Sequence, residues 1–481
     1  MGPLPPTLAL LLGAVAVFGL MWALFVPPWQ APDELQHFAY AESLAQRFAL
    51  PADPHRLAFS TAQRLAVDAS GASRARFYPA AVPPEWSASD FARYLAAARR
   101  GPSASDGGGP NPASSNPPLY YLYADVAYAA SSGGSEFARL YAMRIWTLPL
   151  LLVTTLCAWL LAGEVFGRRR LAQLTCAAVT ALMPMQTAIS SAVNPDALMV
   201  ALWGLALWLG TRVVIRGGGR REVWALTLVT GAALVTKATS YALLPPVLLA
   251  LLLGWLRQPR SERLPVLSWF VIPLVALASP VLIWIVLAIR TGRSPVNTIS
   301  QGTYPRPFSV GGFLSFVWQF YLPRLPGMAP DREVPGLPMY EYWIRQGWGV
   351  FGWLSVKMPE FVYRLLAFVS TAIAVPAVVL VARIRGRVAL GLLAFYSVAL
   401  LSLLALIHLV DYRSLIAHGA GRPVVQGRYL LPLMPLFGLA VSLILIRLPA
   451  RWRGQACAAV VAGLIVLQVL SLATVAQAYY V

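Results

Sequence analysis

Three residues that could do acid–base chemistry, Asp33, Glu34 and His37, lie in the segment 32–38, directly after the first apolar stretch. A carboxylate held at a membrane surface can act as a general base toward an acceptor hydroxyl. Glu34 and His37 are three residues apart, so on a helix they could together hold a divalent metal ion. The alternative is structural, because a proline at the first helical position followed by acids in the first turn is an ordinary helix start.

Two cations lie at the borders of apolar stretches. Lys237 separates two such stretches and is one of two lysines in a chain that has 36 arginines. An ionisable group in this position is a functional candidate, although a lysine snorkelling to the lipid headgroups would give the same pattern. Arg428, followed by Tyr429, could hold a phosphate through two parallel hydrogen bonds. The alternative for Arg428 and Tyr429 is an anchor at the membrane interface.

Two polar turns complete the set of candidates. Asn116 precedes two prolines and the tyrosine-rich segment 119–123, which contains Tyr120. This pattern predicts either a helix that walls a cleft over the outer leaflet or an N-capped helix with tyrosines at headgroup depth. Asn194 and Asp196 flank a proline between two apolar stretches. They are expected to cap the following helix, and substrate contact is the alternative.

The composition is that of a membrane protein. Of the 481 residues, 58% are hydrophobic and 12% are charged, whereas soluble proteins are about half apolar and about a quarter charged. The mean hydropathy of +0.64 points the same way. A set of water-soluble domains is therefore excluded, and one all-α polytopic membrane protein is predicted.

Eleven charge-free stretches are candidate membrane helices. They cover residues 8–26, 145–163, 171–193, 197–211, 223–236, 238–256, 264–289, 365–382, 388–410, 429–446 and 456–481. The stretch 223–236 is the weakest, because residues 223–256 extend about 51 Å as a helix, barely enough for an outward and a return crossing. If that pair only dips into the bilayer, nine crossings remain. We expect the first stretch to be retained, since residues 1–7 carry none of the positive charge of a signal peptide.

Arginine clusters set the predicted orientation. Fifteen arginines form five clusters between apolar stretches, at residues 168–170, 216–221, 257–263, 383–387 and 447–453. The positive-inside rule places these clusters in the cytoplasm and the C-terminus outside. Most of the net charge of +19 is thus a topological signal, and we expect no nucleic-acid partner.

The predicted organisation has two long outer loops. It consists of a first membrane helix (1–26), an extracytoplasmic loop with helices and the catalytic motif (27–137), membrane helices 2 to 7 (138–289), a second outer loop (290–360) and membrane helices 8 to 11 (361–481). A loop of about 110 residues should carry function or its own structure. Because the five polar segments all fall at the outer surface, we expect them to meet in one cavity.

Metal and disulfide chemistry have little support in the sequence. The cysteines all fall inside apolar stretches, so no disulfide framework is implied; they are Cys157, Cys176 and Cys457. The four histidines are scattered and no CxxC motif occurs, so a zinc site is not expected.

The order of these motifs resembles that of GT-C membrane glycosyltransferases. In that group an Asp-Glu pair follows the first span, an x-Pro-Pro-Leu helix comes next, and an arginine (here Arg144 or Arg139) enters the second span. The order is similar to that of protein O-mannosyltransferases and the lipid A aminoarabinose transferase. It is more similar still to uncharacterised bacterial members with PDExxHF early and GRYL late, which match residues 32–38 and 427–430. The pattern covers about residues 1–260 and then mainly the late motif. Asn116 stands where the mannosyltransferases have histidine, a difference that bears on the acceptor class.

The resemblance implies a GT-C-like fold and an inverting transfer of a sugar from a polyprenyl-phosphate donor to an acceptor hydroxyl. The reaction would take place at the outer face of a bacterial cytoplasmic membrane, with a glycan, a lipid or a protein as acceptor. Asp33 would be the base, helped by Glu34. The donor phosphate would be held by Lys237, Arg428 and Arg144. Substrate contacts would come from His37, Asn116, Tyr120, Asn194, Asp196 and Tyr429. Cations that stabilise the leaving phosphate make a cofactor unnecessary, and a divalent metal at Glu34 and His37 is the alternative.

Other functions fit parts of the pattern. A ligase that moves a whole lipid-linked glycan would use similar outer-face cations. A lipid or glycan transporter would need ionisable groups near the middle of the membrane, and His408 is the one ionisable residue inside a predicted span. A non-catalytic scaffold would leave the five outer polar segments without a common explanation.

Overall fold

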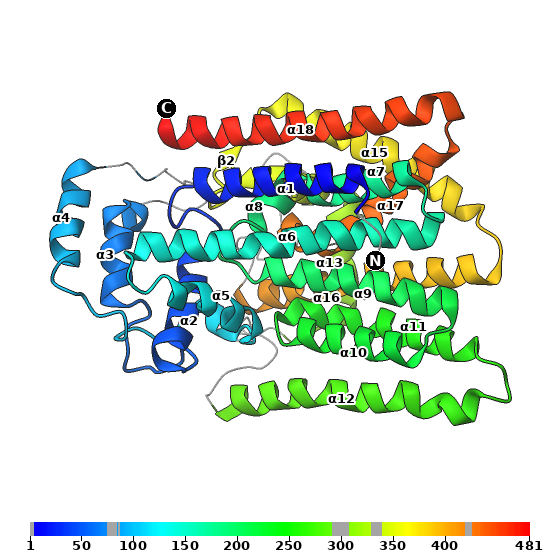
Figure 1. The fold of residues 1–481 in the computed structure, drawn as a ribbon, viewed down its shortest axis with the longest axis horizontal. Coiled ribbons are helices and arrows are strands. Elements are labelled where there is room, and N and C mark those ends of the chain that lie inside the picture. Colours follow the sequence, from blue (N-terminus) through cyan, green and yellow to red (C-terminus); the bar gives the residue numbers. More distant parts are fainter. Residues whose placement is uncertain (1–3, 75–83, 85–86, 291–306, 329–338, 419–425) are drawn as a thin grey trace.

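The structure is a computed structural model that describes residues 4–74, 84, 87–290, 307–328, 339–418 and 426–481. Parts of the expected second outer loop, at 291–306 and 329–338, lie outside the described residues. The described chain is a helical bundle with a smaller group of helices at one end (Figure 1). The expected all-α polytopic fold is therefore confirmed.

Nine helical segments of the described chain are long and apolar enough to cross a membrane. They are α1 (Pro6–Phe25), α6 (Glu136–Phe166), α9 (Asp196–Arg216), η3 with α11 (Ala238–Leu243 and Leu244–Leu256), α12 (Arg263–Arg290), α15 (Glu360–Ala382), α16 (Arg387–His418), η4 with α17 (Gly427–Leu433 and Met434–Arg447) and α18 (Ala450–Tyr480).

The remaining elements lie mainly between these spans. The segment between α1 and α6 contains α2 (Glu34–Arg47), α3 (Thr61–Ala69), η1 (Ala72–Arg74), α4 (Ala88–Ala98), η2 (Pro112–Ser115) and α5 (Leu119–Ala130). Between α12 and α15 are α13 (Val310–Tyr321), α14 (Met339–Gly349) and an antiparallel hairpin of β1 (Val350–Phe351) and β2 (Val356–Lys357).

The predicted count of eleven spans is not confirmed, because two of the expected helices are short or broken. The stretch 171–193 forms α7 (Arg170–Ala181) and α8 (Pro184–Ile189), which are separated at the proline. The stretch 223–236 forms α10 (Arg220–Leu234), whose 15 residues extend about 22 Å. A membrane core is about 30 Å thick, so the turn after α10 is recessed toward the membrane.

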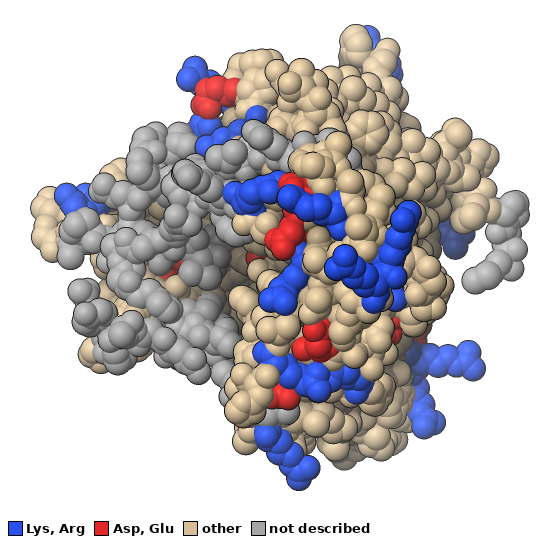
Figure 2. Space-filling view, turned by 90° about the vertical axis from the view of Figure 1, so that its left-hand side faces the viewer, with Lys and Arg blue, Asp and Glu red and all other residues tan. Residues whose placement is uncertain are grey.

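The bundle has two chemically different ends. The five arginine clusters follow α6, α9, α11, α15 and α17, and these turns all lie at the right-hand end in Figure 1, because α7 with α8, and α10, run back between α6, α9 and α11. The helices α2 to α5 lie at the left-hand end, together with the C-terminus. Figure 2 looks onto this second end, where basic and acidic side chains are interspersed. Ion pairs such as Arg56–Asp53 and Arg74–Asp90 balance charge there locally.

Close helix packing fixes the centre of the bundle. Helix α6 packs against α7 and α9, and α17 packs against α7. At Gly438 the contact is so tight that a Cβ atom would lie 2.6 Å from the carbonyl oxygen of Cys176. Small residues allow such backbone approach between membrane helices. Because η4 leads directly into α17, this packing also fixes the position of η4.

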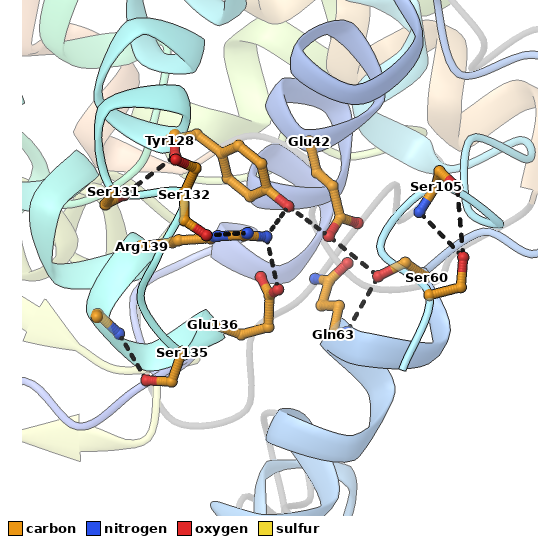
Figure 3. A network of polar contacts seen from close by, with 12 residues as sticks. Glu42, Ser60, Gln63, Ser105, Tyr128, Ser131, Ser132, Ser135, Glu136 and Arg139 are labelled. Carbon is orange, nitrogen blue, oxygen red and sulfur yellow. Dashed lines mark hydrogen bonds and ion pairs between the residues drawn. The ribbon is translucent and has the colours of Figure 1, made fainter. Parts of the chain in front are cut away.

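A buried polar network holds α2 in place (Figure 3). Glu42 Oε1 accepts hydrogen bonds from Ser60 Oγ and from the Tyr128 hydroxyl, each at 3.0 Å. Arg139 Nη1 donates to the Tyr128 hydroxyl at 2.5 Å and to Glu136 Oε1 at 2.8 Å. The network joins α2 to α3, α5 and the start of α6, so it orients the helix whose first turn follows Asp33 and carries His37.

Burial raises the pKa of the Glu42 carboxyl to about 8, and the nearby Glu136 adds to the effect, although the hydrogen bonds from Ser60 and Tyr128 oppose it. Gln63 points toward Glu42 in Figure 3, and its Oε1 atom has no hydrogen-bond partner among the described residues. The neutral form of Glu42 is therefore the form that fits the folded network.

This environment predicts a pH-dependent contribution to stability. Folded Glu42 binds its proton more tightly than the unfolded residue, so the free energy of unfolding should fall as the pH rises from about 4.5 to about 8. Glu42→Gln cannot ionise, so its free energy of unfolding should not fall in this way, and its amide oxygen can still accept the hydrogen bonds of Ser60 and Tyr128. We expect its midpoint of thermal unfolding, measured in detergent, to exceed that of the unmodified protein at pH 8, with a smaller difference at pH 5.

Glu42→Ala is the matched control, because it leaves Ser60 and Tyr128 without their acceptor and should be destabilised at both pH values. An equal pH dependence of unfolding for Glu42→Gln and the unmodified protein would show that Glu42 does not titrate in this range.

Candidate functional site

Asp33 precedes α2 in a conformation that leaves its carboxylate free of the helix. Its φ of 59° is left-handed, and its side chain makes no capping hydrogen bond. The helix begins at Glu34, so Pro32 is not at the first helical position, and the ordinary helix start considered from the sequence is wrong. The Asp33 side chain is 46% exposed, and its Oδ2 lies 2.8 Å from Nη2 of Arg428. This ion pair joins segments 395 residues apart.

Arg428 lies in the first turn of η4, where its guanidinium is almost completely buried, with 3% of the side chain exposed. Its Nε and Nη1 atoms have no hydrogen-bond partner in the part of the chain that is described. Buried donors are normally satisfied. A guanidinium with two such nitrogens beside one engaged nitrogen can therefore bind the oxygens of an anion.

Helix α14 holds the start of η4. The backbone N–H of Gly427 donates to Gln346 Oε1 at 2.9 Å. A Cβ atom at position 427 would collide with the carbonyl oxygen of Trp343, so only glycine fits at this crossing. The sequence did not identify Gln346 or Trp343 as site residues, because a single amide among aromatic residues carries no recognisable spacing.

Lys237 and Asp196 form a second ion pair next to the first. Lys237 Nζ lies 2.5 Å from Asp196 Oδ1, with 14% and 2% of the two side chains exposed. The ring of Tyr429 lies 4.9 Å from Lys237 Nζ and 5.5 Å from Cζ of Arg428. Both distances are within the range of cation–π attraction. The Tyr429 ring thus connects the two cations.

Backbone contacts explain why these turns meet. Asn194 Oδ1 accepts a hydrogen bond from the backbone N–H of Asp196 at 2.9 Å, which closes the turn before α9. The N-cap residue of α9 is Pro195, so the expected cap with Pro195 at the first helical position is wrong. The Asn194 amide also donates to the carbonyl oxygen of Pro32 at 3.1 Å. The N–H of Leu119, at the start of α5, donates to the carbonyl oxygen of Val235 at 3.2 Å.

Aromatic and polar side chains form a wall beside the two ion pairs. His37 Nδ1 lies 2.9 Å from the Tyr121 hydroxyl. Asn116 also donates to this hydroxyl, at 3.2 Å, and it does not cap α5, whose N-cap residue is Pro118. Tyr120 is fully buried next to Tyr121, with ring centroids 5.4 Å apart. These residues are near the ion pairs as expected, and their contact with a substrate stays a prediction.

Glu34 and Arg144 have a different environment from the one expected. Arg144 donates to both carboxylate oxygens of Glu34, at 2.8 and 2.6 Å, and both side chains are buried. Its remaining donors bind carbonyl oxygens of Ala23, Val26 and Pro27. The guanidinium is therefore fully used in joining α2 and α6 to the end of α1. This geometry favours a structural role for both residues and disfavours a catalytic Glu34 or a phosphate-binding Arg144.

The pair Glu34 and His37 does not form the metal site that was considered. Glu34 binds Arg144, whereas His37 contacts Tyr121. No group of three or more histidine, cysteine or acidic residues suited to a metal occurs among the described residues.

The charges of the site are balanced. Burial acts to raise the pKa of Asp33, but Arg428 and Lys237 oppose it and bring that pKa below its ordinary value of 3.8. Burial lowers the pKa of His37 to about 4, although Asp33 acts in the opposite direction. Asp33 is thus ionised at neutral pH and His37 is neutral, and the ion pairs Asp33–Arg428 and Asp196–Lys237 balance the charges of the site.

An apolar cavity of about 600 Å³ adjoins Gly427 and Leu430 of η4. It is lined by side chains of α13, α14, α16 and α17, including Phe320, Trp343, Leu404 and Phe437. Its volume is typical of a cavity that holds a small molecule or part of a lipid. Apolar walls beside the residue that precedes Arg428 suit a ligand with a hydrocarbon part and an anionic head.

The solved structures that resemble this one include an oligosaccharyltransferase, ArnT and an arabinosyltransferase. The oligosaccharyltransferase of Archaeoglobus fulgidus, tethered with an acceptor peptide, has a TM-score of 0.50 and 13% identity, over 98% of this chain and 55% of that chain. ArnT from Cupriavidus metallidurans bound to undecaprenyl phosphate has a TM-score of 0.48 and 15% identity, over 93% of this chain and 62% of that chain. The arabinosyltransferase EmbB of Mycobacterium smegmatis has a TM-score of 0.41 and 14% identity, over 100% of this chain and 42% of that chain.

This chain therefore spans about three fifths of the ArnT chain and less of the others. The comparison confirms the expected GT-C-like fold. No curated protein matches the sequence. A protein family matches residues 16–437, which is most of the chain. The protein thus belongs to the family described as Predicted membrane protein (DUF2142).

Proposed function

We propose that this protein is a membrane glycosyltransferase that moves a sugar from a polyprenyl-phosphate donor to an acceptor hydroxyl. The observation that carries the proposal is the Asp33–Arg428 pair. In it, a half-exposed carboxylate lies 2.8 Å from a buried guanidinium, two nitrogens of which have no partner among the described residues. The first group suits proton abstraction and the second suits a phosphate. The reaction would occur at the outer face of a bacterial cytoplasmic membrane, opposite the arginine clusters.

The donor phosphate would lie between Arg428 and Lys237. As the sugar–phosphate bond breaks, negative charge increases on the phosphate, and two fixed cations in a water-poor site stabilise it. Helices α2 and α9 both begin next to these cations, and their N-termini add a favourable field for an anion. This electrostatic stabilisation of the leaving group does not require a metal ion.

The hydrocarbon chain of the donor would occupy the apolar cavity beside η4. Gly427 and Leu430 line the cavity, and Arg428 lies between them in the sequence of η4, so a lipid whose phosphate binds Arg428 would have its chain near the cavity. A polyprenyl chain longer than the cavity would continue between the helices into the bilayer. A lipid-linked donor fits this arrangement better than a nucleotide sugar, which has no apolar part for the cavity.

In the proposed step, the Asp33 carboxylate takes the proton of the acceptor hydroxyl. The acceptor oxygen forms a bond to the anomeric carbon, while the bond from that carbon to the phosphate oxygen breaks and its electron pair remains on the phosphate. A single displacement of this kind inverts the anomeric configuration. His37, Asn116, Tyr121 and Tyr429 would line the space for the sugar and the acceptor. Glu34 and Arg144 would position α2.

The shared fold supports this proposal, since the A. fulgidus protein with the similar structure is an oligosaccharyltransferase. The sugar could be transferred singly or as part of a larger lipid-linked glycan. Donors that carry one sugar, tested beside donors that carry an oligosaccharide, separate the transferase from a ligase.

The first test is the loss of the proposed base. Asp33→Asn should lower the rate of sugar transfer by about a hundredfold or more, as expected for removing a general base. The measurement is the release of polyprenyl phosphate from polyprenyl-phosphate sugars by the purified protein, with a membrane glycan fraction as acceptor.

Asp53→Asn is the matched control, because Asp53 is similarly exposed at 41% and is paired with Arg56 away from the site. It should retain full activity. Full activity of Asp33→Asn would remove Asp33 as the base, and no transfer by the unmodified protein with any lipid-linked donor would refute the proposed reaction.

The second test concerns the donor phosphate. Lys237→Ala should raise the donor KM by about tenfold or more, because a hydrogen bond to a charged group contributes about 1.5–3 kcal/mol. Lys357→Ala replaces the other lysine, which is exposed on β2, and should leave the KM unchanged. The phosphate role of Lys237 would be excluded if both variants kept the KM of the unmodified protein.

A further inference from the structure

The two ion pairs of the site create a problem for any anionic donor. Asp33 pairs with Arg428, and Asp196 pairs with Lys237. Without a donor, each cation is thus already neutralised by an aspartate. A phosphate that binds the two remaining nitrogens of Arg428 adds negative charge next to two carboxylates. Its binding becomes stronger when one carboxylate gives up its cation or binds a proton.

We infer that the donor phosphate and the Asp33 carboxylate compete for Arg428, so that donor binding releases the base that the reaction needs. The inference rests on the proposed function, and it adds the order of events at the site. Donor binding comes first, and only then is Asp33 free to turn toward the acceptor hydroxyl. A protein without donor holds its base in an unreactive ion pair.

Asp33 is the aspartate that can move. Its side chain is 46% exposed, so water can take the place of the guanidinium at this carboxylate. The Asp196 side chain is 2% exposed, and removing its cation would leave a buried charge uncompensated. Asp196 also stands at the first position of α9, where the helix field stabilises a negative charge. Lys237 therefore stays paired, while Arg428 can change partner.

The loss of Arg428 as a partner would change the basicity of Asp33, because charged groups surround its carboxylate. They are Arg428 on η4, His37 on α2 and Lys237 in the turn after α10, with Asp196 of α9 next to the lysine. Arg428 keeps the pKa of Asp33 below its ordinary value, so the paired carboxylate is a weak base. When a phosphate neutralises Arg428, that pKa rises and the carboxylate becomes a stronger base.

The same exchange would help the product to leave. After the transfer, Asp33 carries the proton of the acceptor and cannot compete for Arg428, so the polyprenyl phosphate stays bound. Once Asp33 loses this proton to water, its carboxylate can take Arg428 back. The ion pair that blocks the base before donor binding would then displace the phosphate at the end of the cycle.

Undecaprenyl phosphate, added to the protein in detergent, tests the competition by equilibrium binding at pH 7. The measured quantity is its Kd for the unmodified protein, Asp33→Asn, Arg428→Gln and the double variant. Asp33→Asn should lower the Kd by about tenfold, because the competing carboxylate is gone. Arg428→Gln should raise the Kd. Asp53→Asn removes a similarly exposed carboxylate that is paired with another arginine, and it should leave the Kd unchanged.

The double variant separates competition from simple repulsion. If the carboxylate acts through Arg428, adding Asp33→Asn to Arg428→Gln should bring little further gain in affinity. If the carboxylate only repels the phosphate, the gain should be the same in both backgrounds, and the inference is overturned. An unchanged or higher Kd for Asp33→Asn alone would overturn it as well.

These outcomes are distinct from a failure of the proposed function. When the unmodified protein binds undecaprenyl phosphate and Arg428→Gln weakens binding, the proposed phosphate site stands whatever Asp33→Asn does. When the unmodified protein does not bind the lipid, the proposed donor is wrong and the competition is wrong with it.

Discussion

The ion pair between Asp33 and Arg428 is the contact on which the site depends. It joins the first turn after α1 to the start of η4, two segments separated by most of the chain. Each partner is held by a different part of the bundle. The Glu34–Arg144 pair fixes the position of α2 against α6, whereas Gly427 and Gln346 fix η4 against α14. The pair therefore forms only when the whole bundle has assembled.

Short and broken helices make room for this contact. Helix α10 ends after 15 residues, and the stretch that follows α7 is interrupted at Pro184. The turn with Lys237 and the turn with Asp196 are consequently drawn toward the membrane. The N-termini of α2 and α9 lie beside the two cations here, and the apolar cavity adjoins Gly427 and Leu430 of η4. The proposed recognition of an anionic head on a hydrocarbon chain rests on this geometry.

Much of the fold and part of the site were predictable from residue types. The lengths of the apolar stretches and the position of the arginine clusters predicted a polytopic helical protein and put the polar segments at one end. Asn194 was expected as a cap, but Pro195 is the N-cap residue of α9, and the Asn194 side chain instead binds the backbone of Asp196 and Pro32. The helix start at Pro32 was wrong, and Asp33 binds Arg428 across the bundle. The cap at Asn116 was wrong because its side chain binds two other groups nearby in the sequence, the carbonyl oxygen of Ala113 and the hydroxyl of Tyr121.

Local patterns along the chain were sufficient to predict the helical class, the alternating direction of the helices and the end at which the polar turns lie. The reason is that a lipid bilayer sets the length of each apolar helix and the charge of the loops that flank it. The partner of each charged residue could not be predicted from its neighbours in the sequence. Arg144 and Arg428 are both arginines near a membrane border, yet Arg144 is saturated by Glu34 and three carbonyl oxygens. Arg428 keeps two nitrogens without a partner among the described residues. That difference arises from packing between helices distant in the chain, where a shift of one turn would exchange every neighbour.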